Sequence, residues 1–154
     1  ILFPSTVTSS ASVILMPSVA EMQALGHRKK IRYITRTTCT ACILLGSLCT
    51  TVFYFGGNFA GTILFHNTDA GLYIRTLSFI CPFLYTNIAL TSILNGLGKT
   101  GTTLVHSVLG ILLRISFVIF AIPVLGIRGY LYGLLLSEIL LSLLHIYALY
   151  HMEF

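Results

Sequence analysis

Residues 102–122 read TTLVHSVLGILLRISFVIFAI, an apolar stretch whose one charged residue is Arg114. An α-helix needs about 20 mostly apolar residues to cross the hydrocarbon core of a bilayer, so this stretch predicts a transmembrane helix. The whole chain has the same character: 56% of its 154 residues are hydrophobic, 8% are charged, and its mean hydropathy is +0.93. Soluble domains carry about 25% charged residues. The composition therefore predicts an all-α membrane protein, embedded in the lipid bilayer.

Apolar intervals between the clustered charges predict about five transmembrane helices. We expect them at about 3–24, 35–55, 72–94, 102–122 and 130–150. The first is crowded with Ser and Thr, which favours a place inside the protein, because small and hydroxylated residues allow close helix packing. The glycines after Phe55 predict a break, and residues 59–66 are too few to span. Pro82, inside the third span, predicts a kink.

A run of basic residues at 27–36 separates the first two spans. We expect a basic cytoplasmic loop that leads into the next helix at the membrane surface; its charges are Arg28, Lys29, Lys30, Arg32 and Arg36. Lys99 falls on the same side of the alternating topology, and Arg128 on the other. Because cytoplasmic loops carry excess Lys and Arg, the basic side is predicted to face the cytoplasm. The net charge of +5 is thereby explained without a nucleic-acid partner, which would need a basic stripe on a soluble scaffold.

Two charges fall near the middle of predicted helices, Arg114 and Glu138. An unpaired charge at that depth costs at least about 2.5 to 3.5 kcal/mol, so neither side chain should face lipid. Glu138 shares a helical face with Ser142 and His145. One interpretation is that Arg114 and Glu138 line a path for a substrate or ion. The other is that they form a structural ion pair, since their helices are neighbours across a short turn.

Other polar residues in the spans are weaker candidates. We expect Asn87 and His106 to make interhelical hydrogen bonds, and Arg75 to extend its charge toward a nearby membrane edge. Cys39 and Cys42 form a C-x-x-C pair, but no second ligand pair at suitable spacing supports a metal site. Gly98-Lys99-Thr100 lacks the earlier glycine of a phosphate loop. No pattern of catalytic residues is present, so we expect neither an enzyme nor a cofactor.

Three motifs resemble a known family in order and spacing. They are PSVAE at residues 17–21 before the basic run, PFLY at 82–85 with SILNGLGKT at 92–100, and LGIRGY at 125–130. Together these resemble the multidrug/oligosaccharidyl-lipid/polysaccharide (MOP) flippase superfamily. The chain is most similar to its polysaccharide-transporter branch, which includes stage V sporulation protein B and lipid II flippases. The multidrug and toxin extrusion (MATE) branch is the close competitor.

The resemblance implies two six-helix bundles that surround a cavity and move a lipid-linked saccharide or a drug by alternating access. The resemblance implies that this chain is a fragment that supplies most of the C-terminal bundle, and that the N-terminal bundle of the same protein is its partner. We expect Arg114 to contact an anionic pyrophosphate. We expect Glu138 either to tune this contact or to couple transport to protons. The alternatives are a cation-coupled drug antiporter and a membrane scaffold that does not transport.

Overall fold

The computed structural model describes residues 2–64 and 68–151, and every element in these ranges is a helix. The helices are α1 (Leu2–Ala24), α2 (Arg28–Leu64), α3 (Thr68–Ser78), α4 (Cys81–Gly96), α5 (Thr100–Phe120), α6 (Ile122–Leu125) and α7 (Ile127–His151). The predicted all-α class is confirmed.

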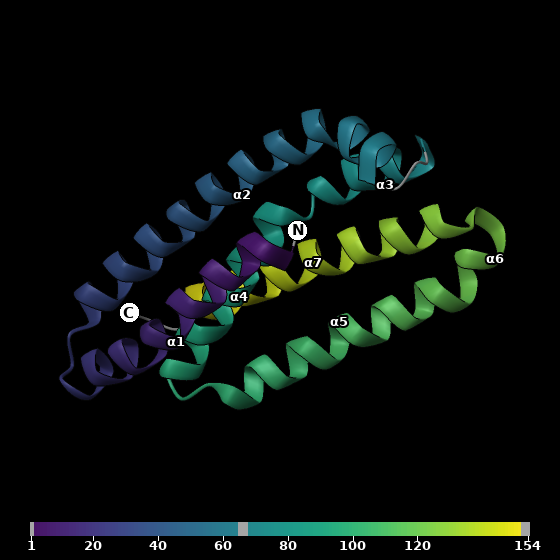
Figure 1. Ribbon diagram of the computed structural model, residues 1–154. Coiled ribbons are helices and arrows are strands. Elements are labelled where there is room, and N and C mark those ends of the chain that lie inside the picture. The colour runs from purple at the N-terminus through teal and green to yellow at the C-terminus, as the bar shows by residue number, and fades with distance from the viewer. Residues whose placement is uncertain (1, 65–67, 152–154) are drawn as a thin grey trace.

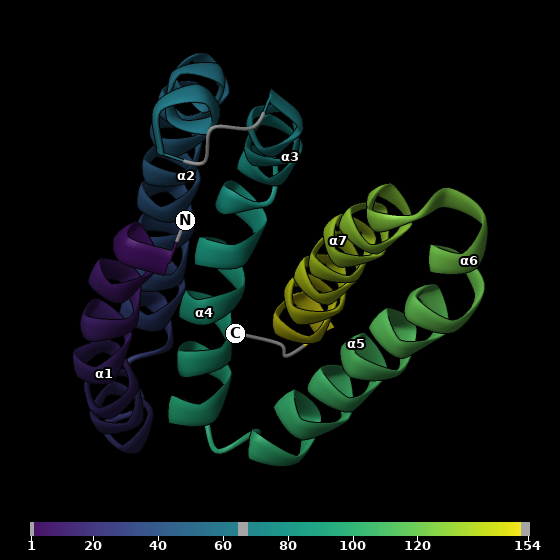
Figure 2. The ribbon, with the colours of Figure 1, turned by 45° about the vertical axis from the view of Figure 1, so that its right-hand side comes forward.

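Helix α4 lies at the centre of the arrangement. It packs against α1 and α2 on one side and against α7 on the other, and α5 packs on the outer side of α7. Figure 1 shows the long helices running side by side, and Figure 2 shows α4 between the α1–α2 group and the α5–α7 pair. Any site shared by the two groups must therefore lie along α4.

Several helices are long and apolar enough to cross a membrane. Three single helices meet this requirement of length and composition: Arg28–Gly57, Thr100–Phe120 and Ile127–His151. The bent pair of α3 and α4 makes a fourth if it is counted as one span. Their surfaces carry many large exposed apolar side chains, among them Leu44, Leu104 and Tyr150. Such side chains are suited to lipid rather than water. Helix α1, the Ser- and Thr-rich first span of the prediction, is not among the candidates.

The second helix differs from its prediction at both ends. The basic run expected as a loop at 27–36 is helical from Arg28 onward. Lys and Arg are good helix formers, and the chain turns instead at Gly26, whose φ of +70° is easy only for glycine. The break expected after Phe55 is also wrong, because α2 continues to Leu64. Gly57 lies inside this helix, where a Cβ atom would come within 2.9 Å of the Arg75 side chain on α3, so it permits close packing.

The third predicted span, at 72–94, is interrupted where the sequence predicted a kink. Helix α3 ends at Ser78, α4 begins at Cys81, and the two axes differ by 46°. Pro82 lies in the first turn of α4, where its missing N–H is not needed by the helix. The hydroxyl of Thr50 on α2 donates a 2.8 Å hydrogen bond to the carbonyl of Ser78. A neighbouring helix thus satisfies a backbone group that the break exposes.

Two clusters of buried residues hold α4 to α1 and α2. The first joins Val19 of α1 and Ile31 of α2 to the last turns of α4, and also includes Leu149 of α7. The second lies nearer the bend and groups Cys42 and Cys49 with Tyr85. The four cysteines are free thiols, as small apolar packing residues would be.

Helix α2 packs closely on α4 at Gly46. A Cβ atom there would overlap the backbone of Pro82, which cannot rotate away. We predict that Gly46→Ala lowers the free energy of unfolding by about 1 to 3 kcal/mol, the usual cost of overpacking. Thermal unfolding in detergent measures this. Gly56→Ala, in the same helix with open space around it, is the control and should not destabilise; equal losses for both variants would contradict the packing account.

Candidate functional site

An open cleft of about 540 Å³ lies between α1, α4, α5 and α7. Its polar side chains come from all four helices: Ser9 and Ser12, Asn87, Thr91 and Ser92, Ser107, and Glu138 and His145. The remaining wall is apolar and includes Met16, Leu84 and Leu141. Mostly apolar walls with a few placed polar groups are typical of ligand sites.

Glu138 is the buried charge of the cleft. Its side chain is 5% exposed, and it lies midway along α7 beside α4 and α5. The amide nitrogen of Asn87 on α4 donates hydrogen bonds of 2.7 Å to Glu138 Oε2 and 2.9 Å to the Glu138 carbonyl. The predicted interhelical hydrogen bonding of Asn87 is thus present, and it joins α4 to α7 at the cleft wall.

Arg114 meets Glu138 from α5. Its Nη2 atom forms a salt bridge with Glu138 Oε1, and its Nε atom donates a 2.8 Å hydrogen bond to the hydroxyl of Ser137. A carboxylate bound by both a guanidinium and an amide keeps its charge at membrane depth far more cheaply than one left alone. The Arg114–Glu138 ion pair, one of two interpretations of these charges, is therefore formed, and Glu138 links three helices.

Small residues allow α5 and α7 to approach closely enough for this pairing. A Cβ atom on Gly110 would lie 2.9 Å from Leu141 Cδ1, and one on Gly133 would overlap Phe117. Ser137, fully buried, presents its hydroxyl to Arg114. Close approach through small residues is common between membrane helices.

Two histidines form a second polar layer between the same helices. The rings of His106 on α5 and His145 on α7 lie 5.0 Å apart, tilted by 58°. Both side chains are buried, and His145, at 2% exposed, lines the cleft. Among the described residues, neither nitrogen of His145 has a hydrogen-bond partner. His106 contacts α7 through its ring, and its Nδ1 atom also has no hydrogen-bond partner, so among the described residues the interhelical hydrogen bond expected of His106 is not formed at that nitrogen.

The other predicted residues lie elsewhere. The guanidinium of Arg75 is 4.3 Å from the centre of the Tyr54 ring, a cation–π contact between α3 and α2. The basic residues of α2 are exposed and do not line the cleft. Arg114 itself is not a lining residue and contacts the cleft through Glu138. The described residues contain no group of three or more His, Cys, Asp or Glu that could hold a metal ion.

Ser137 is the site residue that the prediction did not name, whereas His145 was placed on the helical face of Glu138 and does line the cleft. The helical spacing of His145 to Glu138 places both on one face of α7, as predicted. Ser137 gave no comparable signal, because a serine beside a buried charge is as often a packing residue.

The ion pair predicts strong coupling between its two members. Arg114→Leu leaves the buried carboxylate with Asn87 alone, so each single leucine variant should be clearly less stable than the parent, while the double variant should regain part of the loss. We expect a coupling free energy of about 1 to 3 kcal/mol from unfolding in detergent. Arg75→Leu combined with Glu138→Leu is the matched control and should be additive. If the losses of unfolding free energy in Arg114→Leu and Glu138→Leu simply add up in the double variant, the two charges do not stabilise each other and the pairing is contradicted.

Comparison with known proteins bears on the family. No family model matches the chain, and no solved structure matches it. It is similar to stage V sporulation protein B of Bacillus subtilis (strain 168), with 23% identity over 144 residues. The match covers 92% of this chain but only 28% of the relative, so the chain spans less than a third of that protein's length. The predicted resemblance to the flippase branch that includes stage V sporulation protein B is thereby confirmed.

Proposed function

We propose that this chain is part of a flippase in the cytoplasmic membrane, a multi-pass protein that moves a lipid-linked polysaccharide or peptidoglycan precursor across the bilayer. The observation that carries the proposal is the similarity to stage V sporulation protein B, which runs along nearly the whole chain. In this proposal the protein acts as a transporter of the cell envelope and not as an enzyme.

The cleft supports this proposal, because it offers both kinds of surface that a lipid-linked saccharide needs. Hydroxyl groups from α1, α4 and α5 can hydrogen-bond a sugar, and the apolar wall with Met16 and Leu84 suits an adjoining lipid chain. Its four helices belong to the two groups that meet at α4, so movement of one group against the other would change its shape.

The polar network supports a distinct role for each charged residue. Glu138 and Asn87 line the cleft and can meet the substrate directly. Arg114 has 34% of its side chain exposed and uses two of its nitrogens on Glu138 and Ser137. We propose that it holds the carboxylate in place and turns toward an anionic pyrophosphate when the pair opens.

Cation-coupled drug export is the second candidate, and one observation favours it. A carboxylate that is 5% exposed and still lines a cleft is a suitable place to bind a proton or another cation. In that case the Glu138 carboxylate would release Arg114 and bind the coupling cation instead. The transported molecule would be a drug rather than a lipid. The two candidates therefore differ in substrate and in the role of Glu138.

The test is a flipping assay with the full-length protein in liposomes. A fluorescent lipid-linked saccharide is incorporated, and an impermeant quencher reports how much reaches the outer leaflet. We expect the parent protein to flip this lipid. Glu138→Gln removes the salt bridge to Arg114 and should slow flipping by about tenfold or more. Ser116→Ala, an exposed position on α5, is the control and should match the parent.

The outcomes separate the candidates. If the parent protein does not flip the lipid but exports a cationic drug when an opposing ion gradient is applied, the antiporter is favoured. Parent protein that moves neither would contradict the transport proposal and favour a scaffold. Glu138→Gln and Arg114→Ala that both flip lipid at the parent rate would remove the ion pair from the mechanism.

A further inference from the structure

The first turns of α2 carry a dense group of positive charges. Five cations lie between residues 28 and 36, and all are exposed: Arg28, Lys29, Lys30, Arg32 and Arg36. No Asp or Glu occurs in α2 from Arg28 to Leu64. Lys99 follows Leu97, which packs with Ile31, so it adds a further charge at this end of the molecule. Glu21, near the end of α1, offsets only one of these charges.

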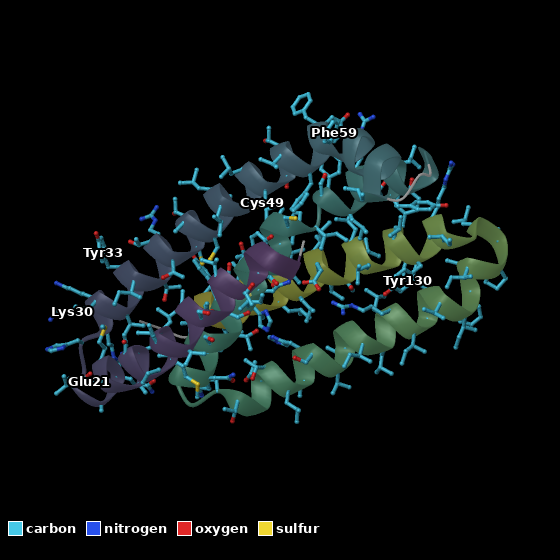
Figure 3. All side chains as sticks on the ribbon, viewed as in Figure 1. Glu21, Lys30, Tyr33, Cys49, Phe59 and Tyr130 are labelled. Atoms are coloured by element: carbon cyan, nitrogen blue, oxygen red, sulfur yellow. The ribbon has the colours of Figure 1, made fainter. Side chains whose placement is uncertain are left out.

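The orientation of α2 is fixed by Ile31. This side chain is 1% exposed and packs in the cluster with Val19 and Leu97, so its side of the helix faces α1 and α4. Lys29 and Tyr33 stand two positions to either side, which is about 200° around a helix. They therefore point away from the protein, and Figure 3 shows Tyr33 and Lys30 projecting outward from α2.

The same outward face becomes apolar further along the helix. Arg36 shares the face of Tyr33, and the next turns place Leu44, Leu48 and Phe55 on it at helical spacing. Those three are 66%, 64% and 78% exposed, as suits lipid-facing side chains. The cations thus stand at the end of a lipid-facing stripe, and between them lies Tyr33, 72% exposed. Exposed Tyr at such a boundary is typical of the headgroup layer.

We propose that the outward face formed by Lys29, Tyr33 and Arg36, flanked by Lys30, binds the headgroup of an anionic phospholipid such as phosphatidylglycerol. Arg36 can bind a phosphate through two N–H groups, and the lysines supply further positive charge. The Tyr33 ring packs against the upper part of the acyl chains, with its hydroxyl at the level of the phosphate. The site is independent of the cleft and of the transported molecule.

The experiment places a reporter in this face. The 154-residue sequence contains no tryptophan. Tyr33→Trp therefore adds an indole, and its fluorescence is obtained by subtracting the fluorescence of the parent protein. Reconstituted full-length protein is mixed with brominated phosphatidylglycerol or brominated phosphatidylcholine, and quenching gives the relative affinity of each lipid at this position. We expect phosphatidylglycerol to be preferred, and the preference to fall as salt is raised.

A charge variant and a second reporter complete the design. Three substitutions together, Lys29→Gln, Lys30→Gln and Arg36→Gln, should weaken phosphatidylglycerol binding by about 100-fold, since each surface cation contributes roughly fivefold. Tyr130→Trp, at the opposite end of the molecule, should show a smaller preference. Equal quenching of the Tyr33→Trp indole by both lipids would overturn the proposal and favour an acidic protein partner. A preference that survives high salt and the triple variant, or that inorganic phosphate abolishes where sodium chloride of the same ionic strength does not, would also overturn it.

Discussion

The burial of the Glu138 carboxylate is the constraint on which the arrangement of helices depends. A carboxylate at membrane depth must be neutralised or hydrogen-bonded, and here Arg114 supplies the charge and Asn87 the hydrogen bond. Because these partners come from α5 and α4, the three helices must meet at one level. Breaking any contact would leave a polar group in apolar surroundings, so the network fixes the helices relative to one another as well as holding a charge.

Small residues make this meeting possible. Gly110 and Gly133 let α5 and α7 approach, and Gly46 does the same for α2 against the first turn of α4. Helices in lipid gain little from apolar contact alone, so close packing and polar contacts must supply the specificity. The result is an arrangement in which tight contacts hold α4 to its neighbours on either side, while an open cleft remains between α1 and the α5–α7 pair.

Much of the fold could be predicted from apolar intervals, because lipid imposes a simple length rule on helices. The rule failed where backbone chemistry was ambiguous. Glycines at 56 and 57 looked like a break, yet α2 continues through both, and Gly57 lies where α3 comes close. The basic run looked like a loop because charges usually leave the membrane, although Lys and Arg also favour helix.

The site was predictable in its charges but not in its assembly. Arg114 and Glu138 stand out because charge is costly at their depth, whereas their pairing depends on how α5 and α7 rotate about their axes, which sequence spacing does not fix. Ser137 became visible only once that rotation was known.

The central claim, that substrate occupies the cleft between α1, α4, α5 and α7, is tested most directly by cysteine protection. Ser107 lines the cleft and is exposed, whereas its neighbour Val108 is exposed but does not line it. Cysteine is placed at each position in the full-length protein, and labelling by a thiol reagent is measured against the parent with and without a lipid-linked saccharide. The account predicts that the saccharide slows labelling at Ser107→Cys and leaves Val108→Cys unchanged. Equal labelling at Ser107→Cys with and without the saccharide would contradict it.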